Sequence, residues 1–158
     1  MRKCFMLLVA LLVPVAAVAA DVSGNWIAQI TSPSGSISER VFTFKVSGNK
    51  LTGTLINQSV ALATFEVTGK PKMTGKLTTQ TGSPLEILEG EVSGDDISFA
   101  VKSFMMGNEV KTVYKGKVSG NEIKFTAETK IPEGMTSPSG SPIRPMPPQE
   151  LVAKRIVP

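Results

Sequence analysis

The sequence predicts an all-β fold, a closed, antiparallel, up-and-down β-barrel of about eight to ten strands. Three observations support this prediction. A short turn phrase recurs along the chain, the segments between turns alternate apolar and polar residues, and no stretch after residue 20 has sustained helical periodicity. An open sheet of this length would leave two unpaired edges, which closure removes.

The turn phrase reads Val-Ser-Gly followed by Asn or Asp. It occurs at 22–25, 46–49, 92–95 and 118–121, with a looser Val-Thr-Gly-Lys copy at 67–70. Gly beside Asn or Asp favours a tight turn because both residues tolerate a positive φ. Alternation between these turns predicts about ten strands, at 24–31, 38–47, 50–57, 61–68, 72–79, 84–92, 95–103, 108–118, 121–129 and 149–157.

A second repeat lies inside the strands and reads apolar, polar, Gly, polar, apolar. Its copies are at 51–55, 73–77, 88–92 and 114–118. Each glycine falls on the apolar face, where a missing side chain lets the strand bend or the opposite wall approach. Repeated around a sheet, such glycines are typical of the corners of a small, strongly coiled barrel.

The two faces of the predicted strands differ in polarity. The face expected outside carries Thr43, Lys45, Thr52, Thr54, Lys76, Glu89, Glu91, Lys111, Lys115, Lys117 and Lys124. This wettable surface argues against an outer-membrane barrel and an integral membrane protein. The inward set holds the candidate ligand-binding residues Phe42, Phe44, Phe65, Phe99, Tyr114 and Phe125, together with Met73. These side chains form either a packed core or the walls of an apolar cavity.

Residues 1–20 have the pattern of a signal peptide. Arg2 and Lys3 precede an apolar run at 5–13, and small residues lead up to Ala20, near which cleavage is expected. The run is too short to span a bilayer comfortably, although a retained anchor is the alternative. We therefore expect a signal peptide at 1–20 followed by a single barrel domain at 21–158. The mature domain is expected to be exported to the periplasm or secreted.

Composition excludes several chemistries. The chain has no histidine, and its one cysteine, Cys4, lies in the signal. The commonest general base and the usual zinc ligands are therefore missing, so no catalytic residue, metal or cofactor is expected. The formal charge of +4 includes Arg2 and Lys3, and the lysines alternate with acids, which argues against a nucleic-acid partner. The Ser-x-x-Lys pattern at 47–50 lies in an expected hairpin turn, where it has no catalytic setting.

The first and last strands carry a distinctive set of residues. Gly24 and Trp26 open the first strand, and Arg155 lies in the last. Alternation points Trp26 and Arg155 inward, so a closed barrel lets the guanidinium cover the indole, a contact of about 1–2 kcal/mol. This arrangement resembles the calycin superfamily of lipocalins, fatty-acid-binding proteins and avidins. The resemblance implies a lipocalin-like barrel, and it implies that Gly24, Trp26 and Arg155 close the barrel and do not bind ligand.

The chain is also similar to small exported bacterial proteins with repeated Val-Ser-Gly hairpins and a terminal Ala-Lys-Arg strand. That resemblance implies fold and export only. A Pro-rich loop at 131–148 joins the last two predicted strands. Such a loop is either a lid over the barrel mouth, with Arg144 and Met146 as mouth contacts, or an extended linker. The apolar hairpin tip at 104–106 is a core edge, a partner contact or a mouth rim.

Two functions remain open at this stage. The first is an exported, non-enzymatic barrel that binds a small apolar ligand. The alternative is a solid-core structural or protein-interaction module of the cell envelope, with its protein partner unknown. An enzyme is a weaker third possibility, in which the inward Tyr114 and Arg155 are the first residues to test. The interior volume of the barrel separates the first two.

Overall fold

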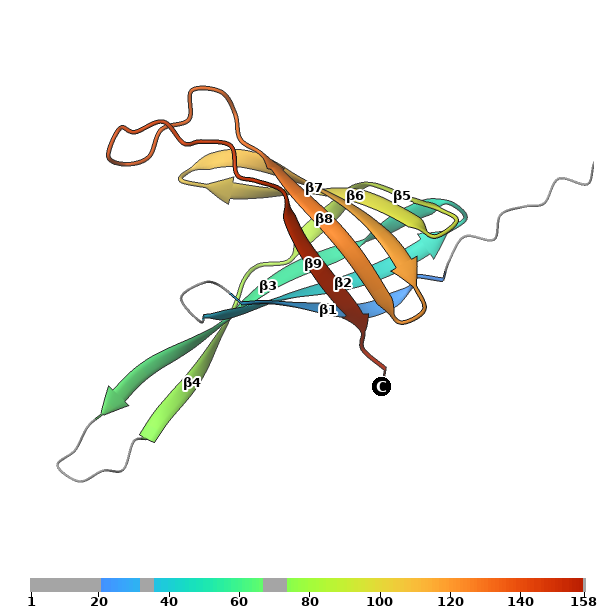
Figure 1. The fold of residues 1–158 in the computed structure, drawn as a ribbon, viewed down its shortest axis with the longest axis horizontal. Helices are drawn as coiled ribbons and strands as arrows, with labels where there is room; N and C mark the ends of the chain where they lie inside the picture. Colours follow the sequence, from blue (N-terminus) through green and yellow to red (C-terminus); the bar gives the residue numbers. More distant parts are fainter. Residues whose placement is uncertain (1–20, 32–35, 67–73, 158) are drawn as a thin grey trace, which may run out of the picture.

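The computed structural model describes the backbone of residues 21–31, 36–66 and 74–157, and the side chains of these ranges outside 60–80. The described chain contains nine β-strands and no helix (Figure 1). The strands are β1 (Gly24–Thr31), β2 (Ile37–Ser47), β3 (Lys50–Glu66), β4 (Thr74–Thr81), β5 (Leu85–Ser93), β6 (Asp96–Met105), β7 (Asn108–Ser119), β8 (Glu122–Lys130) and β9 (Gln149–Arg155).

Eight of these strands form a closed ring. The order around it is β1, β2, β3, β5, β6, β7, β8 and β9, and β9 pairs with β1 to complete the barrel. Every pairing is antiparallel, and neighbours in the ring follow one another along the chain except where β4 is left out between β3 and β5. The predicted closed, up-and-down, all-β barrel is confirmed.

The strand count differs from the prediction at one place. The predicted strands 50–57 and 61–68 are continuous, because residues 50–66 form the single 17-residue strand β3, and residues 67 and 68 lie outside the described part of the chain. No glycine or proline separates them, so nothing in the chain between them forces a turn. Residues 50–60 of β3 pair with β2 and its early residues also pair with β5, whereas Gln58–Glu66 pairs with β4. This second part and β4 form a two-stranded arm that leaves the barrel (Figure 1).

The repeated turn phrase makes three hairpins. Gly48, Gly94 and Gly120 have φ values of 63°, 58° and 59°, and they connect β2 to β3, β5 to β6 and β7 to β8. Only glycine adopts this left-handed conformation without steric cost. The Ser-x-x-Lys pattern lies in the first of these turns, where Ser47 pairs with Lys50 across the hairpin.

Strand glycines let the barrel wall bend sharply. A Cβ atom on Gly53 would lie 1.8 Å from the carbonyl oxygen of Thr43, and one on Gly90 would lie 2.2 Å from that of Leu51. The β3–β5 pairing shifts register between Leu51 and Thr54, beside both contacts. Bulges of this kind bend a strand and raise its twist, as closure of a small barrel requires.

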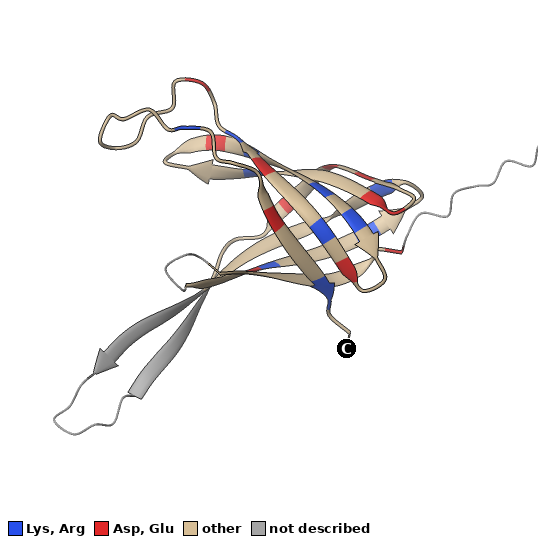
Figure 2. Cartoon of the chain, in the orientation of Figure 1, with Lys and Arg blue, Asp and Glu red and all other residues tan. Residues whose placement is uncertain are grey.

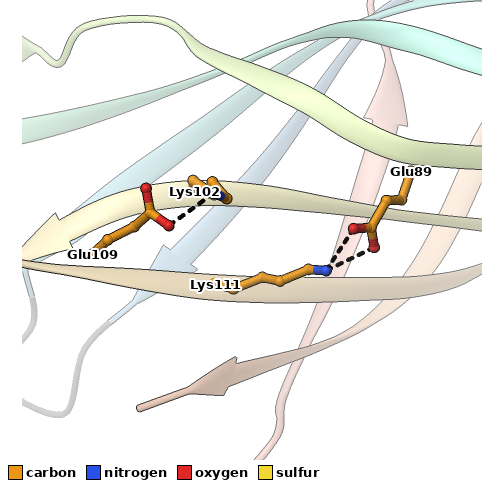
Figure 3. A network of polar contacts seen from close by, with 4 residues as sticks. All are labelled: Glu89, Lys102, Glu109 and Lys111. Carbon is orange, nitrogen blue, oxygen red and sulfur yellow. Dashed lines mark hydrogen bonds and ion pairs between the residues drawn. The ribbon is translucent and has the colours of Figure 1, made fainter. Parts of the chain in front are cut away.

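Basic and acidic residues are distributed along the strands of the barrel (Figure 2). Around the second register shift, between Leu88 and Glu91, Glu89 has a φ of 51° and accepts two hydrogen bonds from Nζ of Lys111, at 2.8 and 2.7 Å. The hydrogen bond and the charge of Lys111 lower the pKa of the Glu89 carboxyl. Lys102 and Glu109 form a neighbouring pair at 2.8 Å (Figure 3).

Candidate ligand-binding pocket at the barrel mouth

The two ends of the barrel are built differently. The tight turns at Gly48, Gly94 and Gly120 gather at one end, which we call the base. The β6–β7 hairpin tip and the long connection from β8 to β9 lie at the opposite end, which we call the mouth (Figure 1). The connections between successive strands alternate between the two ends of the barrel, so different residues lie at the base and at the mouth.

The base is closed by a contact between the first and last strands. Trp26 pairs with Arg155 in the β1–β9 register, and Cζ of Arg155 lies 4.5 Å from the Trp26 ring centroid. The guanidinium donates to the carbonyl oxygens of Ser23, at 2.7 Å, and Asp21. The indole Nε1 donates to the carbonyl oxygen of Val22 at 2.9 Å. Together these bonds tie the segment before β1 across the base.

Gly24 lies beside this contact with a φ of 116°. A Cβ atom there would stand 3.5 Å from Nη1 of Arg155, so the guanidinium lies against the bare backbone. Gly24, Trp26 and Arg155 are therefore brought together at the base, at the opposite end from the mouth.

A layer of aromatic rings fills the middle of the barrel. Phe99 and Tyr114 stack with ring centroids 4.8 Å apart, and Phe42 and Phe125 are 5.3 Å apart. Phe44 stacks on Phe42 at 5.6 Å. All five side chains are buried, and the aromatic pairs add about 0.5–1.5 kcal/mol each to what burial of their area contributes. This part of the barrel is solid.

Above the aromatic layer a pocket of about 510 Å³ opens at the mouth. It is lined by Arg40, Leu55, Asn57, Leu85, Val101, Ser103, Met105, Val110, Thr112, Tyr114, Ala127, Thr129, Met146, Pro147, Pro148 and Gln149. Every strand of the ring except β1 contributes lining residues, and β5 contributes its first residue, Leu85. The interior is thus packed toward the base and open toward the mouth.

The six candidate ligand-binding residues separate into three groups. Tyr114 lines the pocket and forms part of its floor. Phe42, Phe44, Phe99 and Phe125 lie in the aromatic layer, and the pocket lining does not include them. Phe65 pairs with Gly75 in the β3–β4 arm, and its side chain lies outside the described residues, as does Met73.

Arg40 is the charged side chain of the pocket. It precedes Phe42 by two residues on β2, so it shares the inward face of that strand. Its Cζ lies 5.9 Å from the Tyr114 ring centroid, and its Nη2 donates to Oε1 of Gln149 at 2.9 Å. Burial raises the pKa of the Tyr114 hydroxyl, and the positive charge of Arg40 partly opposes this rise. Tyr114 is therefore a neutral hydroxyl at neutral pH.

The sequence interpretation missed Arg40 because it searched the inward face for apolar residues. The signal was present, since counting back from Phe42 by two reaches Arg40. Counting two residues forward from Leu55 reaches Asn57, and counting two back from Tyr114 reaches Thr112. At the mouth the inward positions become polar, and Oγ1 of Thr112 lies 3.0 Å from Oγ1 of Thr129.

The Pro-rich loop folds back on itself and reaches the pocket. The Ile143 amide donates to the Met135 carbonyl oxygen at 3.0 Å, and the Ser137 amide donates to that of Ser141 at 2.8 Å. Met135 is buried, and Met146 lines the pocket. The loop therefore forms a hydrogen-bonded turn and is not an extended linker. Its end borders the mouth. Arg144 is exposed and is not among the lining residues.

The β6–β7 hairpin tip stands beside the pocket. Met105 lines the pocket, whereas Phe104 is 78% exposed and Met106 is 56% exposed. Met106 has a φ of 51°, an uncommon conformation for a residue with a side chain. The tip therefore combines a rim contact with two outward apolar side chains.

Comparison with known proteins assigns no family: the chain matches no protein-family model, no curated protein and no solved structure. Among the described residues, no cluster of three or more acidic, histidine or cysteine side chains is arranged to hold a metal ion. The described part also contains no helix with the length and apolarity to cross a membrane.

Proposed function

We propose that the protein is an exported, non-enzymatic β-barrel that binds a small apolar molecule in the mouth pocket. The observation that carries this proposal is the pocket itself, about 510 Å³ above a solid aromatic layer. Small-molecule sites are concave, largely apolar and furnished with a few polar groups. The lining combines apolar walls, to which Leu55, Val101 and Met105 belong, with polar side chains at the mouth.

Two further features support the wider proposal. The signal-like pattern of residues 1–20 supports export to the periplasm or outside the cell. A calycin relationship is supported by the eight-stranded closed ring and by the stacking of Arg155 on Trp26 at its base. In such a barrel the base is structural and the open end admits the ligand.

A fluorescent probe and a blocking substitution test the binding proposal. N-phenylnaphthylamine, an uncharged probe that brightens in apolar sites, should bind the wild-type protein. Ser103→Phe places a ring in the pocket and should abolish the signal, because Ser103 is a lining residue. The matched control is Lys102→Phe, one residue earlier on the exposed face of β6. Absence of binding by the wild type, or equal binding by Ser103→Phe, contradicts the proposal.

A second candidate function is a protein-interaction module, and the hairpin tip favours it. Phe104 and Met106 are the two most exposed of the large apolar side chains on this hairpin. An affinity-tagged wild type and a Phe104→Asp/Met106→Asp variant should then differ in the partners they retain from a periplasmic extract. Identical retained proteins exclude the tip as a partner contact.

A further inference from the structure

The mouth pocket contains one charged side chain and no opposite charge. Among the described residues that line it, Arg40 alone is ionic. Glu39, its neighbour in the chain, accepts a hydrogen bond from Gln29 at 2.8 Å. The ion pairs found in the described part of the chain involve lysines, and none includes Arg40. The guanidinium charge is therefore not balanced by a carboxylate of the described protein.

One nitrogen of this guanidinium lacks a hydrogen-bond partner. Nη2 donates to Gln149, whereas Nη1 is buried and makes no hydrogen bond to a described residue. A buried charged donor raises the free energy of the folded state unless an acceptor pairs with it. The Gln149 bond and the Tyr114 ring hold the group in place. The pocket thus presents a fixed cationic donor.

The space beside Arg40 restricts the shape of a ligand. Phe42 lies two residues further along β2, and its ring packs against Phe125 and Tyr114. This layer blocks the barrel below the pocket, so a long chain has no path toward the base. At the mouth, Met105 and Met146 offer apolar contact. A fitting molecule is therefore compact, with a polar end near Arg40 and an apolar body near the two methionines.

We propose that the mouth pocket binds a compact organic anion, whose carboxylate, sulfonate or phosphate group pairs with the guanidinium of Arg40, the charged side chain of the lining. This inference rests on the proposed function, because it names the class of ligand for the same pocket. An ionic hydrogen bond to the planar guanidinium is stronger than a neutral one and suits these groups. The neutral Tyr114 hydroxyl supplies a further donor on the pocket floor.

Two probes with one aromatic body test the charge requirement. Anilinonaphthalene sulfonate carries an anionic group, and N-phenylnaphthylamine has the same body without it. We expect Arg40→Gln to weaken binding of the sulfonate about tenfold and to leave the uncharged probe nearly unchanged. Arg40→Lys keeps the charge and should lose less. The matched control is Arg144→Gln, which removes an exposed cation that does not line the pocket.

The outcomes separate this inference from the proposed function. If both probes bind the wild type and Arg40→Gln weakens both equally or neither, the anion inference is wrong and the pocket remains a ligand site. If neither probe binds, the proposed function fails and the inference fails with it. Should Arg40→Gln not fold, the wild type decides: added salt should weaken the sulfonate selectively, and equal salt sensitivity of the two probes overturns the inference.

Discussion

Phe125 on β8 lies directly across from Gly116 on β7, and its ring occupies the space above that glycine. A Cβ atom on Gly116 would stand 2.5 Å from Cδ1 and 2.7 Å from Cε1 of the ring. The glycine thus provides the room in which one edge of the aromatic layer packs. A glycine in the strand repeat of the sequence is therefore needed for the aromatic rings to pack in the middle of the barrel.

Gly116→Ala should therefore destabilise the protein. The new methyl group displaces the Phe125 ring, which already packs 5.3 Å from Phe42, and overpacking of this kind costs about 1–3 kcal/mol. Urea unfolding measures the loss. Lys115→Ala, on the exposed face next to Gly116, is the control and should change stability by less. Equal stability of Gly116→Ala and the wild type would show that the ring has space to move.

Substitution of Arg155 should open the base. Arg155→Met keeps much of the side-chain stem but loses the bonds to the Ser23 and Asp21 carbonyl oxygens, so we expect a loss of about 1–3 kcal/mol. The chain contains one tryptophan, so its fluorescence reports on Trp26 alone. The emission should shift as the indole gains contact with water. An unchanged spectrum and unchanged unfolding midpoint would argue against a closing role.

The hydroxyl of Tyr114 should titrate above its ordinary pKa of about 10. Burial is the main cause of the raised pKa, and Arg40 acts in the opposite direction. The protein has a single tyrosine, so the ultraviolet absorbance of phenolate follows this one group. Removing the positive charge in Arg40→Gln should raise the Tyr114 pKa further. A lower pKa in that variant would contradict the contact between the two side chains.

The same shift has a consequence for stability. Because the folded-state pKa of Tyr114 exceeds the unfolded value, its contribution is fully present below about pH 10 and is lost as the pH rises through the folded-state pKa. Tyr114→Phe removes the ionisable group. We expect the variant to lose less stability than the wild type between neutral and strongly alkaline pH, as followed by thermal unfolding.

Glu89 gives a prediction at acid pH. Its hydrogen bond with Lys111 lowers the carboxyl pKa, so the stabilising effect is present above the ordinary pKa and is lost as the pH falls through the lowered one. Nuclear magnetic resonance titration of the Glu89 carboxyl carbon measures this pKa. In Lys111→Met it should return toward the ordinary value. Lys124→Met, on the exposed face of β8, is a control that should leave it in place.

Much of the barrel could be predicted from period-two alternation. On β6, the buried Ile97 and Phe99 alternate with the more exposed Asp96 and Ser98, although Ala100 departs from this alternation because it is buried. The three glycine turns fix where the base hairpins reverse. The arm could not be predicted in the same way. The arm leaves the barrel because β5 pairs with the early part of β3. This pairing is long-range, and no local sequence pattern indicates it.

The candidate site was less accessible to sequence reasoning. Alternation indicates that Phe42 and Arg40 face inward, but it does not say where the packed layer ends and the pocket begins. That boundary depends on how five aromatic rings interlock, which is a property of side-chain volumes in three dimensions. The stretch at 146–148 adds a wall from a distant part of the chain, and its proline content indicates neither its direction nor its partner.

The position of β9 between β1 and β8 decides when folding can finish. Ser23 and Arg155, which are joined across the base, are 132 residues apart in the chain. Contacts with such sequence separation form late, because loop closure must be completed before they contribute. A nascent chain that has reached only β8 has two unpaired strand edges, one on β1 and one on β8. Within the ring, β9 is therefore the strand that removes the edges along which unfinished copies could associate.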